Sequence, residues 1–223
     1  MELGQRLILG ELRRRVRLPF GPVQSKESPS ALLTWFLGCE LDGERTAAGC
    51  KIGSMRIAEC QEHEVALLDR HIPSPGVVSS HARRHARQQA GSSTFLVAWH
   101  DGQPVGSCEV RWDGCTAPEV QAAHGDCPEI NGLGVWPESF RSQGIGTALI
   151  RAAEELVRKR GGKRIGLGVD ENNPRAAALY SRLGYHPAAP YLDRWSYQDV
   201  EGVTHQVADA CTFMIKRFQP DGS

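Results

Sequence analysis

Three features that mark common classes of protein are missing from this 223-residue sequence. No apolar run approaches the roughly 20 residues that a membrane-spanning helix needs. The 26 lysines and arginines are balanced by 26 aspartates and glutamates, so no overall positive field attracts nucleic acid or an anionic membrane. We therefore expect neither a nucleic-acid partner nor a membrane partner, and any phosphate-bearing ligand must be held by local groups.

Paired cysteines are also absent. The seven cysteines include no CxxC pair, and their odd number does not suit a disulfide framework. His81 with His85, and His124 with Cys127, have metal-like spacings, but neither has a second pair at a standard distance. The sequence therefore predicts no metal site, and its cysteines are expected to be thiols in a reducing compartment.

The first quarter of the chain lacks a periodic apolar pattern that could form a buried face. It contains an arginine cluster, several prolines and one apolar stretch that is too short and too far from the arginines for a secretory leader. A strand-like segment begins directly after Met55. We therefore expect a flexible N-terminal extension over residues 1–54, a folded domain over 55–218 and a short tail over 219–223.

The remainder alternates between helical and strand patterns, which is typical of an α/β domain. Asp101-Gly102 between two apolar, β-prone runs predicts a hairpin. The helix expected at 79–89 carries three arginines, two histidines and no acid, and we interpret it as a solvated face rather than a substrate-binding edge. The other expected elements are helices at 62–69 and from 145, and strands at 129–135, 164–169 and 210–216.

The segment Arg141 to Gly146 joins an expected strand to an expected helix. Two glycines let the backbone approach an anion closely, and the amides and dipole of a helix start attract it. A pyrophosphate suits such a site. The spacing fits neither the GxxxxGK phosphate loop nor the GxGxxG dinucleotide motif, because Leu149 stands where the third glycine is needed.

This R-x-x-G-x-G segment resembles the acyl-CoA signature of the GNAT superfamily of N-acetyltransferases. Asn173 to Tyr185 is similar to the N-x-x-A-x-x-L-Y-x-x-x-G-F/Y segment of the same superfamily, in the expected order. The resemblance covers residues 55–218. It implies a GNAT-like α/β fold, with a central mixed twisted sheet flanked by helices, and acetyl-CoA as co-substrate.

The resemblance also implies a direct attack of an amine on the thioester, through a tetrahedral intermediate. Tyr180 matches the proton donor to the leaving thiolate, and Glu129 is our candidate base, with Glu109 or water as alternatives. The residues expected to hold acetyl-CoA are Leu133, Gly134, Val135, Arg141, Ser142, Gln143, Gly144, Ile145, Gly146, Thr147, Asn173, Ala176 and Tyr180.

The sequence does not identify the acceptor of the acetyl group. A primary amine of a small molecule is the leading interpretation, and the alternatives are a protein or peptide N-acetyltransferase and a non-catalytic acyl-CoA-binding regulatory module. Three acids in the loop at 112–128, Asp113, Glu119 and Asp126, would suit a cationic amine. The aromatic segment at 191–197 could line an acceptor pocket or complete a hairpin. A homodimer and a cytoplasmic location are further expectations, the latter because acetyl-CoA and reduced cysteines coexist there.

Overall fold

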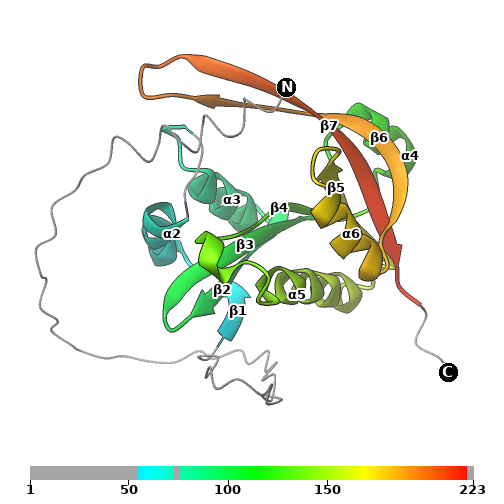
Figure 1. The fold of residues 1–223 in the computed structure, drawn as a ribbon, viewed down its shortest axis with the longest axis horizontal. Coiled ribbons are helices and arrows are strands. Elements are labelled where there is room, and N and C mark those ends of the chain that lie inside the picture. The colour runs from blue at the N-terminus through cyan, green and yellow to red at the C-terminus, as the bar shows by residue number, and fades with distance from the viewer. Residues whose placement is uncertain (1–54, 73–75, 220–223) are drawn as a thin grey trace, which may run out of the picture. The chain divides into compact units, whose positions relative to one another are not determined.

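A computed structural model describes residues 55–72 and 76–219 (Figure 1). The extension expected at 1–54 and residues 220–223 of the expected tail lie outside the described residues. A strand begins at Met55, the first described residue. In the described part of the chain, no helix is long and apolar enough to cross a membrane.

The described residues form one seven-stranded mixed sheet with the order β1-β2-β3-β4-β5-β7-β6. Neighbouring strands are antiparallel, apart from the parallel pair β4 and β5. The strands are β1 (Met55–Glu59), β2 (Ser93–His100), β3 (Gln103–Arg111), β4 (Glu129–Val135), β5 (Arg164–Asp170), β6 (His186–Gln198) and β7 (Thr204–Arg217).

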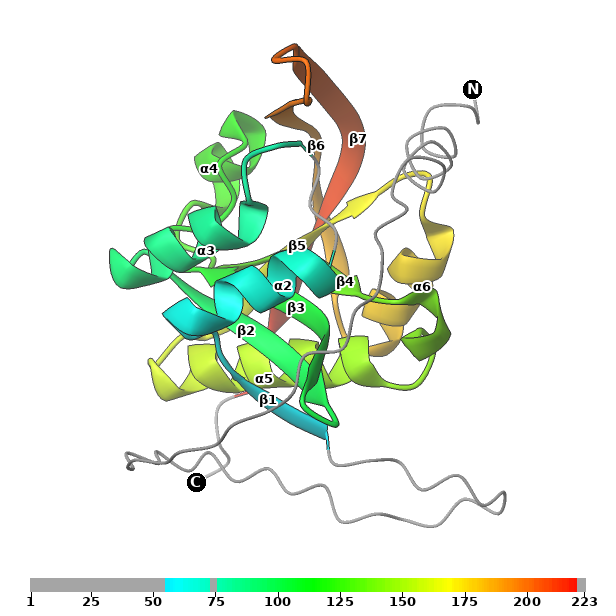
Figure 2. The ribbon, with the colours of Figure 1, turned by 90° about the vertical axis from the view of Figure 1, so that its left-hand side faces the viewer.

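Helices cover both faces of this sheet, as expected for the fold (Figure 2). Alternate residues of β2 explain the layering, since Leu96 and Ala98 join the core under α5 while Phe95 and Val97 join the core under α2. The helical elements are η1 (Glu62–Glu64), α2 (Val65–His71), α3 (Ser80–Gln89), α4 (Pro118–His124), η2 (Glu138–Phe140), α5 (Ile145–Lys159) and α6 (Pro174–Arg182).

Most expected elements are present. The Asp101-Gly102 hairpin joins β2 to β3, and α5 begins at Ile145, directly after the glycine loop. The helix expected at 62–69 divides into η1 and α2. Helix α4 was not predicted; it is only seven residues long, and Pro118 at its first position was interpreted as part of a loop.

The prediction of a solvated face on α3 is wrong, and α5 also holds a buried charge. On α3, His81 and His85 are buried, and Arg87 forms an ion pair with a carboxylate on β3. On α5, the side chain of Glu154 is buried and accepts hydrogen bonds of 2.9 Å from Lys216 and 3.1 Å from the Tyr185 hydroxyl. In both cases the partner is distant in the sequence, so local charge patterns gave no sign of it.

Candidate active site

Strands β4 and β5 separate where the sheet changes from antiparallel to parallel pairing. They pair only through Glu129 with Gly166 and Ile130 with Leu167. The pairing of β4 with β3 shifts at Gly132, which has a φ of +59° and bends the strand away. The strands beyond this point leave a gap in the sheet, and two cavities adjoin it.

The first cavity, here called the α6-side cavity, has a volume of about 220 Å³. Leu133 of β4 forms one wall, the end of β5 forms another, and α6 closes it with Asn173, Ala176 and Tyr180. The second, the hairpin-side cavity, has a volume of about 170 Å³ and is lined by Glu129 of β4 together with the β6–β7 hairpin. Both cavities include Ile130, Gly132, Gly168 and Asp170 in their walls.

The glycine loop before α5 presents backbone amides to solvent. Gly144 is the N-cap of α5 and has a φ of +86°, a conformation that glycine adopts readily. The first hydrogen bond of the helix runs from the Ala148 amide to the Gly144 carbonyl at 2.9 Å. In the described part of the chain, the preceding amides of α5 therefore have no intrahelical acceptor, which makes this end of α5 a suitable site for an anion.

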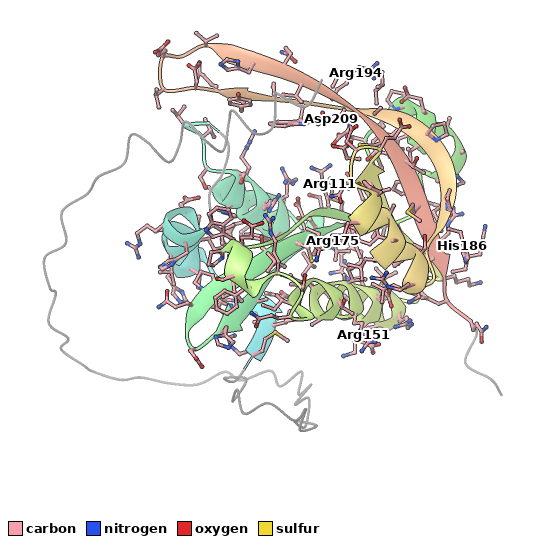
Figure 3. The ribbon with its side chains drawn as sticks, viewed as in Figure 1. Arg111, Arg151, Arg175, His186, Arg194 and Asp209 are labelled. Atoms are coloured by element: carbon pink, nitrogen blue, oxygen red, sulfur yellow. The ribbon has the colours of Figure 1, made fainter. Side chains whose placement is uncertain are left out.

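Two arginines lie beside this loop. Arg141, the one expected from the sequence, is exposed and lies 3.4 Å from the carboxylate of Glu138. Arg175, at the start of α6, donates a hydrogen bond of 2.8 Å to the Ser142 hydroxyl, and it was not predicted. Figure 3 labels Arg175 on the α6 side of the gap. The loop thus has a positively charged border that a pyrophosphate would suit.

Tyr180 faces the gap from α6. The Asn173 side chain caps this helix by accepting a 3.0 Å hydrogen bond from the Ala176 amide, and Gly184 follows its end with a φ of +89°. Tyr180 lies two turns along, partly buried, with its ring centroid 6.3 Å from that of Tyr185. Burial raises the pKa of Tyr180, so its hydroxyl stays protonated at neutral pH.

Glu129 lies on the opposite face of the sheet from Tyr180, at the base of the hairpin-side cavity. Its side chain is buried, with Arg111 at 3.7 Å and the Asn131 amide at 3.4 Å. Burial raises the pKa of Glu129 to about 7, although Arg111 opposes this shift. A carboxylate with such a pKa can accept and return a proton near neutral pH.

Glu109, the alternative base, has a different role. It is fully buried and forms two hydrogen bonds with Arg87, of 2.7 and 2.6 Å, and Arg111 lies 3.6 Å away. Burial alone would raise the pKa of Glu109, but the hydrogen bonds and charge of Arg87 and the charge of Arg111 lower it. This geometry assigns Glu109 to an ion pair that joins α3 to β3.

The hairpin of β6 and β7 bounds the second cavity. Tyr191 and Cys211 are directly opposite each other on this hairpin, as are Asp193 and Asp209, and all four side chains line the cavity. At the tip, the Val77 amide donates a 2.9 Å hydrogen bond to the Gln198 carbonyl, so the loop before α3 is joined to the hairpin (Figure 2). The aromatic segment therefore both completes a hairpin and lines a pocket.

The acids predicted from the loop at 112–128 do not line this cavity. Asp126 pairs with Arg164, and Glu119 lies 3.9 Å from Arg194 on the outer face of the hairpin. Asp113 is also absent from the cavity wall. Asp193 and Asp209 provide the acidic wall instead, and Figure 3 shows Arg194 and Asp209 on opposite faces of the hairpin. Only the pairing of β6 with β7 brings them together, so the sequence gave no local sign of it.

The predicted acetyl-CoA residues divide into three groups in the structure. Leu133, Asn173, Ala176 and Tyr180 line the α6-side cavity. The loop from Arg141 to Gly144 is exposed, with Ile145 buried beneath it and Gly146 and Thr147 partly exposed in the first turn of α5. Gly134 and Val135 continue β4 toward this loop, and a Cβ at Gly146 would lie 3.8 Å from Val135.

Comparisons with known proteins agree with this fold. The N-acetyltransferase MJ1207 of Methanocaldococcus jannaschii, itself uncharacterized, is 38% identical over 93 residues, which cover 41% of this chain and only 38% of that relative. The ribosomal-protein-S18-alanine N-acetyltransferase of Escherichia coli matches with a TM-score of 0.52 at 19% identity, covering 76% of this chain and 97% of the other. An N-acetyltransferase of Staphylococcus aureus gives a TM-score of 0.55 at 14% identity, with 75% and 100% covered.

The match to a family model covers more than half of the chain. It extends over residues 64–185, from the end of η1 to the tyrosine that follows α6, and its family is described as the acetyltransferase (GNAT) family. This range includes the gap between β4 and β5, the glycine loop and Tyr180. The chain therefore belongs to the GNAT acetyltransferase family.

Proposed function

We propose that this protein is an N-acetyltransferase that transfers the acetyl group of acetyl-CoA to a primary amine of a small molecule. The observation that carries the proposal is the gap in the sheet, since a proton donor, Tyr180, and a candidate base, Glu129, face it from opposite sides. The solved yncA acetyltransferase of Salmonella typhimurium, which shares the fold with a TM-score of 0.53 at 17% identity, contains acetyl-CoA.

The glycine loop is proposed to bind the pyrophosphate of acetyl-CoA. The unbonded amides at the start of α5 donate to its oxygens, and Arg175 and Arg141 add positive charge. The α6-side cavity, which Tyr180 lines, is proposed to hold the thioester end of acetyl-CoA. Backbone amides of β4 near Leu133 to Val135 are the proposed donors to the developing oxyanion.

The proposed reaction requires two proton transfers. Glu129 takes a proton from the acceptor ammonium, directly or through water, and the free amine attacks the thioester carbon. The tetrahedral intermediate then collapses as the carbon–sulfur bond breaks, and the hydroxyl of Tyr180 protonates the CoA thiolate. The nitrogen loses its second proton as the amide forms, and this proton returns to Tyr180 through solvent, while Glu129 releases its proton to solvent. The amide and CoA are the products.

The hydrogen bond between Val77 and Gln198 favours a small acceptor. It joins the loop before α3 to the tip of the hairpin, whose other end lines the hairpin-side cavity. An extended peptide would need an open groove in this region. The protein N-acetyltransferase alternative draws on the named activity of the Escherichia coli protein, with which this chain shares the fold at 19% identity.

The test is release of the CoA thiol from acetyl-CoA in the presence of a panel of small amines and a panel of peptides. We expect amine-dependent release, with the small amines preferred. Faster release with peptides would support the protein acetyltransferase alternative. Acetyl-CoA binding with no release in either panel would support a non-catalytic acyl-CoA-binding module.

A further inference from the structure

Arg84 of α3 is a cation that has no counter-ion of its own. Its side chain is partly buried and approaches the ring of Phe95, with 5.7 Å between the Cζ atom and the ring centroid. Among residues 55–72 and 76–219, no hydrogen bond or ion pair involves its guanidinium group. Burial lowers the pKa of Arg84, and the nearby charges of Arg87 and Arg111 add to the effect, whereas Glu109 opposes it.

The nearest carboxylates do not neutralise this group. Glu109 is already held by two hydrogen bonds from Arg87, and Arg111 lies between Glu109 and Glu129, at 3.6 and 3.7 Å. Arg84, Arg87 and Arg111 gather around Glu109 and Glu129, with Asp113 also near Arg87 and Asp193 near Arg111. Glu129 has a pKa of about 7 and is only partly ionised at neutral pH. Within the described part of the chain, Arg84 is the guanidinium group of these three that has no carboxylate in contact.

The position of Arg84 is built into the sheet. Its guanidinium group lies against Gly132 at the bend of β4, and a Cβ at position 132 would overlap its Nη2 atom and lie 2.8 Å from its Cζ atom. Gly132 lines both cavities at the gap. A similar arrangement occurs across the gap on β5, where a Cβ at Gly168 would overlap the hydroxyl of Tyr191. The lack of a side chain at Gly132 and Gly168 therefore leaves room for Arg84 and Tyr191, which approach β4 and β5 from the same face of the sheet.

The hairpin gives the hairpin-side cavity an acidic wall. Asp193 and Asp209 are directly opposite each other on β6 and β7, an arrangement of like charges that destabilises a strand pair. Burial and the charge of Asp209 raise the pKa of Asp193, which Arg111 opposes. Figure 3 shows Arg111 and Asp209 near the space between the central strands and the hairpin. Acidic side chains line the cavity itself, whereas the cations lie next to its wall, with Arg84 against Gly132 and Arg111 3.7 Å from Glu129.

We infer that the acceptor is a zwitterion of the amino-acid type, whose carboxylate is bound by Arg84 beside Gly132 while its ammonium group faces Glu129 and the aspartates of the hairpin. This inference rests on the proposed acetyltransferase function and specifies its substrate class. A guanidinium group binds a carboxylate through two parallel hydrogen bonds, so Arg84 would fix the orientation of the acceptor and its amine. A simple diamine would leave Arg84 without a partner.

The test compares each amino acid with its own α-carboxamide, which keeps the amine and removes the negative charge. Thiol release is measured with the twenty common L-amino acids, and then with the amide of each one that reacts. We expect kcat/KM for the amide to be roughly 10- to 100-fold lower than for the acid, because a charge-assisted contact is lost. Equal values for acid and amide, or acetylation confined to amines without a carboxylate, would overturn the inference.

Substitution of Arg84 shows whether this residue makes the distinction. We expect Arg84→Gln to lower kcat/KM for the acid much more than for the amide, so that the ratio between acid and amide falls to about 1, whereas a merely structural role would lower both equally. Arg84→Lys should keep part of the ratio, and this variant decides the question if Arg84→Gln does not fold. Arg83→Gln, on the exposed side of the same helix, is the matched control and should keep the full ratio. An unchanged ratio in both Arg84 variants would contradict the assignment.

Failure of the proposed function would give a different result. Calorimetric titration of the wild-type protein with acetyl-CoA is independent of the acceptor, and Arg84→Gln should leave this affinity unchanged. No binding of acetyl-CoA, together with no thiol release from any amine, would refute the acetyltransferase function itself. Binding and turnover with amines that lack a carboxylate would refute only the inference about Arg84.

Discussion

Replacement of Glu129 by glutamine separates its proposed role as a base from its contribution to stability. The amide keeps the size of the side chain but cannot take a proton from the acceptor. Loss of a general base typically costs 10²- to 10⁴-fold in rate, and we expect kcat/KM of Glu129→Gln to fall within this range. In the wild type, activity should rise with pH through about 7, the pKa of Glu129, and the variant should lack this rise.

The same substitution should increase stability at high pH. The pKa of Glu129 is raised from 4.5 to about 7 in the folded protein, a difference of about 2.5 units, and each unit corresponds to about 1.36 kcal/mol. Because the pKa of Glu129 is higher in the folded than in the unfolded protein, its protonation stabilises the fold fully at pH values below the unfolded pKa. This stabilisation is lost as the pH rises from 4.5 through 7. The wild type should therefore lose about 3 kcal/mol between pH 4.5 and pH 8 at this site, whereas Glu129→Gln should not.

The assay is chemical denaturation of both proteins at several pH values, together with initial rates over the same range. Glu109→Gln is the matched control, because it removes a buried partner of Arg87 and should cost about 3 to 5 kcal/mol while keeping the rise in activity near pH 7. Retention of this rise in Glu129→Gln would leave water or another group as the base. A stability difference between Glu129→Gln and wild type that does not change with pH would contradict the buried, raised-pKa carboxyl.

Three further predictions concern other parts of the chain. Tyr180→Phe should lower turnover by roughly 10²- to 10⁴-fold with little change in CoA affinity, and full activity of this variant would leave water as the proton source. Bulky residues at both Gly144 and Gly146 should greatly weaken CoA binding in calorimetry, because side chains would block the approach of the pyrophosphate; unchanged affinity would sink the assignment of this loop. A chain that begins at Met55 should unfold cooperatively and bind CoA like the full chain, and insolubility would show that the domain boundary is wrong.

The parts of the site that were predictable are those encoded by consecutive residues. The glycine loop and the start of α5 depend on backbone preferences and helix ends, which act within a few residues. The local pattern also placed Glu129 on the correct strand, while Tyr180 was identified through the resemblance. Neither the pattern nor the resemblance could show that the two residues face a gap from opposite sides, which follows from the short pairing of β4 with β5.

The parts that were not predictable depend on contacts between distant segments. The ion pair between Arg87 and Glu109 joins residues 22 positions apart, and the one between Lys216 and Glu154 spans 62 positions. The facing aspartates of the hairpin depend on strand register, which a single sequence does not reveal. For this reason, acids in the sequence near 112–128 appeared to be the acceptor acids, although those of the hairpin line the cavity.

The two cavities of the gap have a kinetic consequence for the proposed reaction. If, as proposed, acetyl-CoA occupies the α6-side cavity and the amine the hairpin-side cavity, both can be bound at the same time. The lines of double-reciprocal plots of initial rate should then intersect, which indicates a ternary complex. Parallel lines would indicate an acetylated-enzyme intermediate. As a product inhibitor, CoA should compete with acetyl-CoA but not with the amine. A saturating amine would fill only the hairpin-side cavity and could not displace CoA.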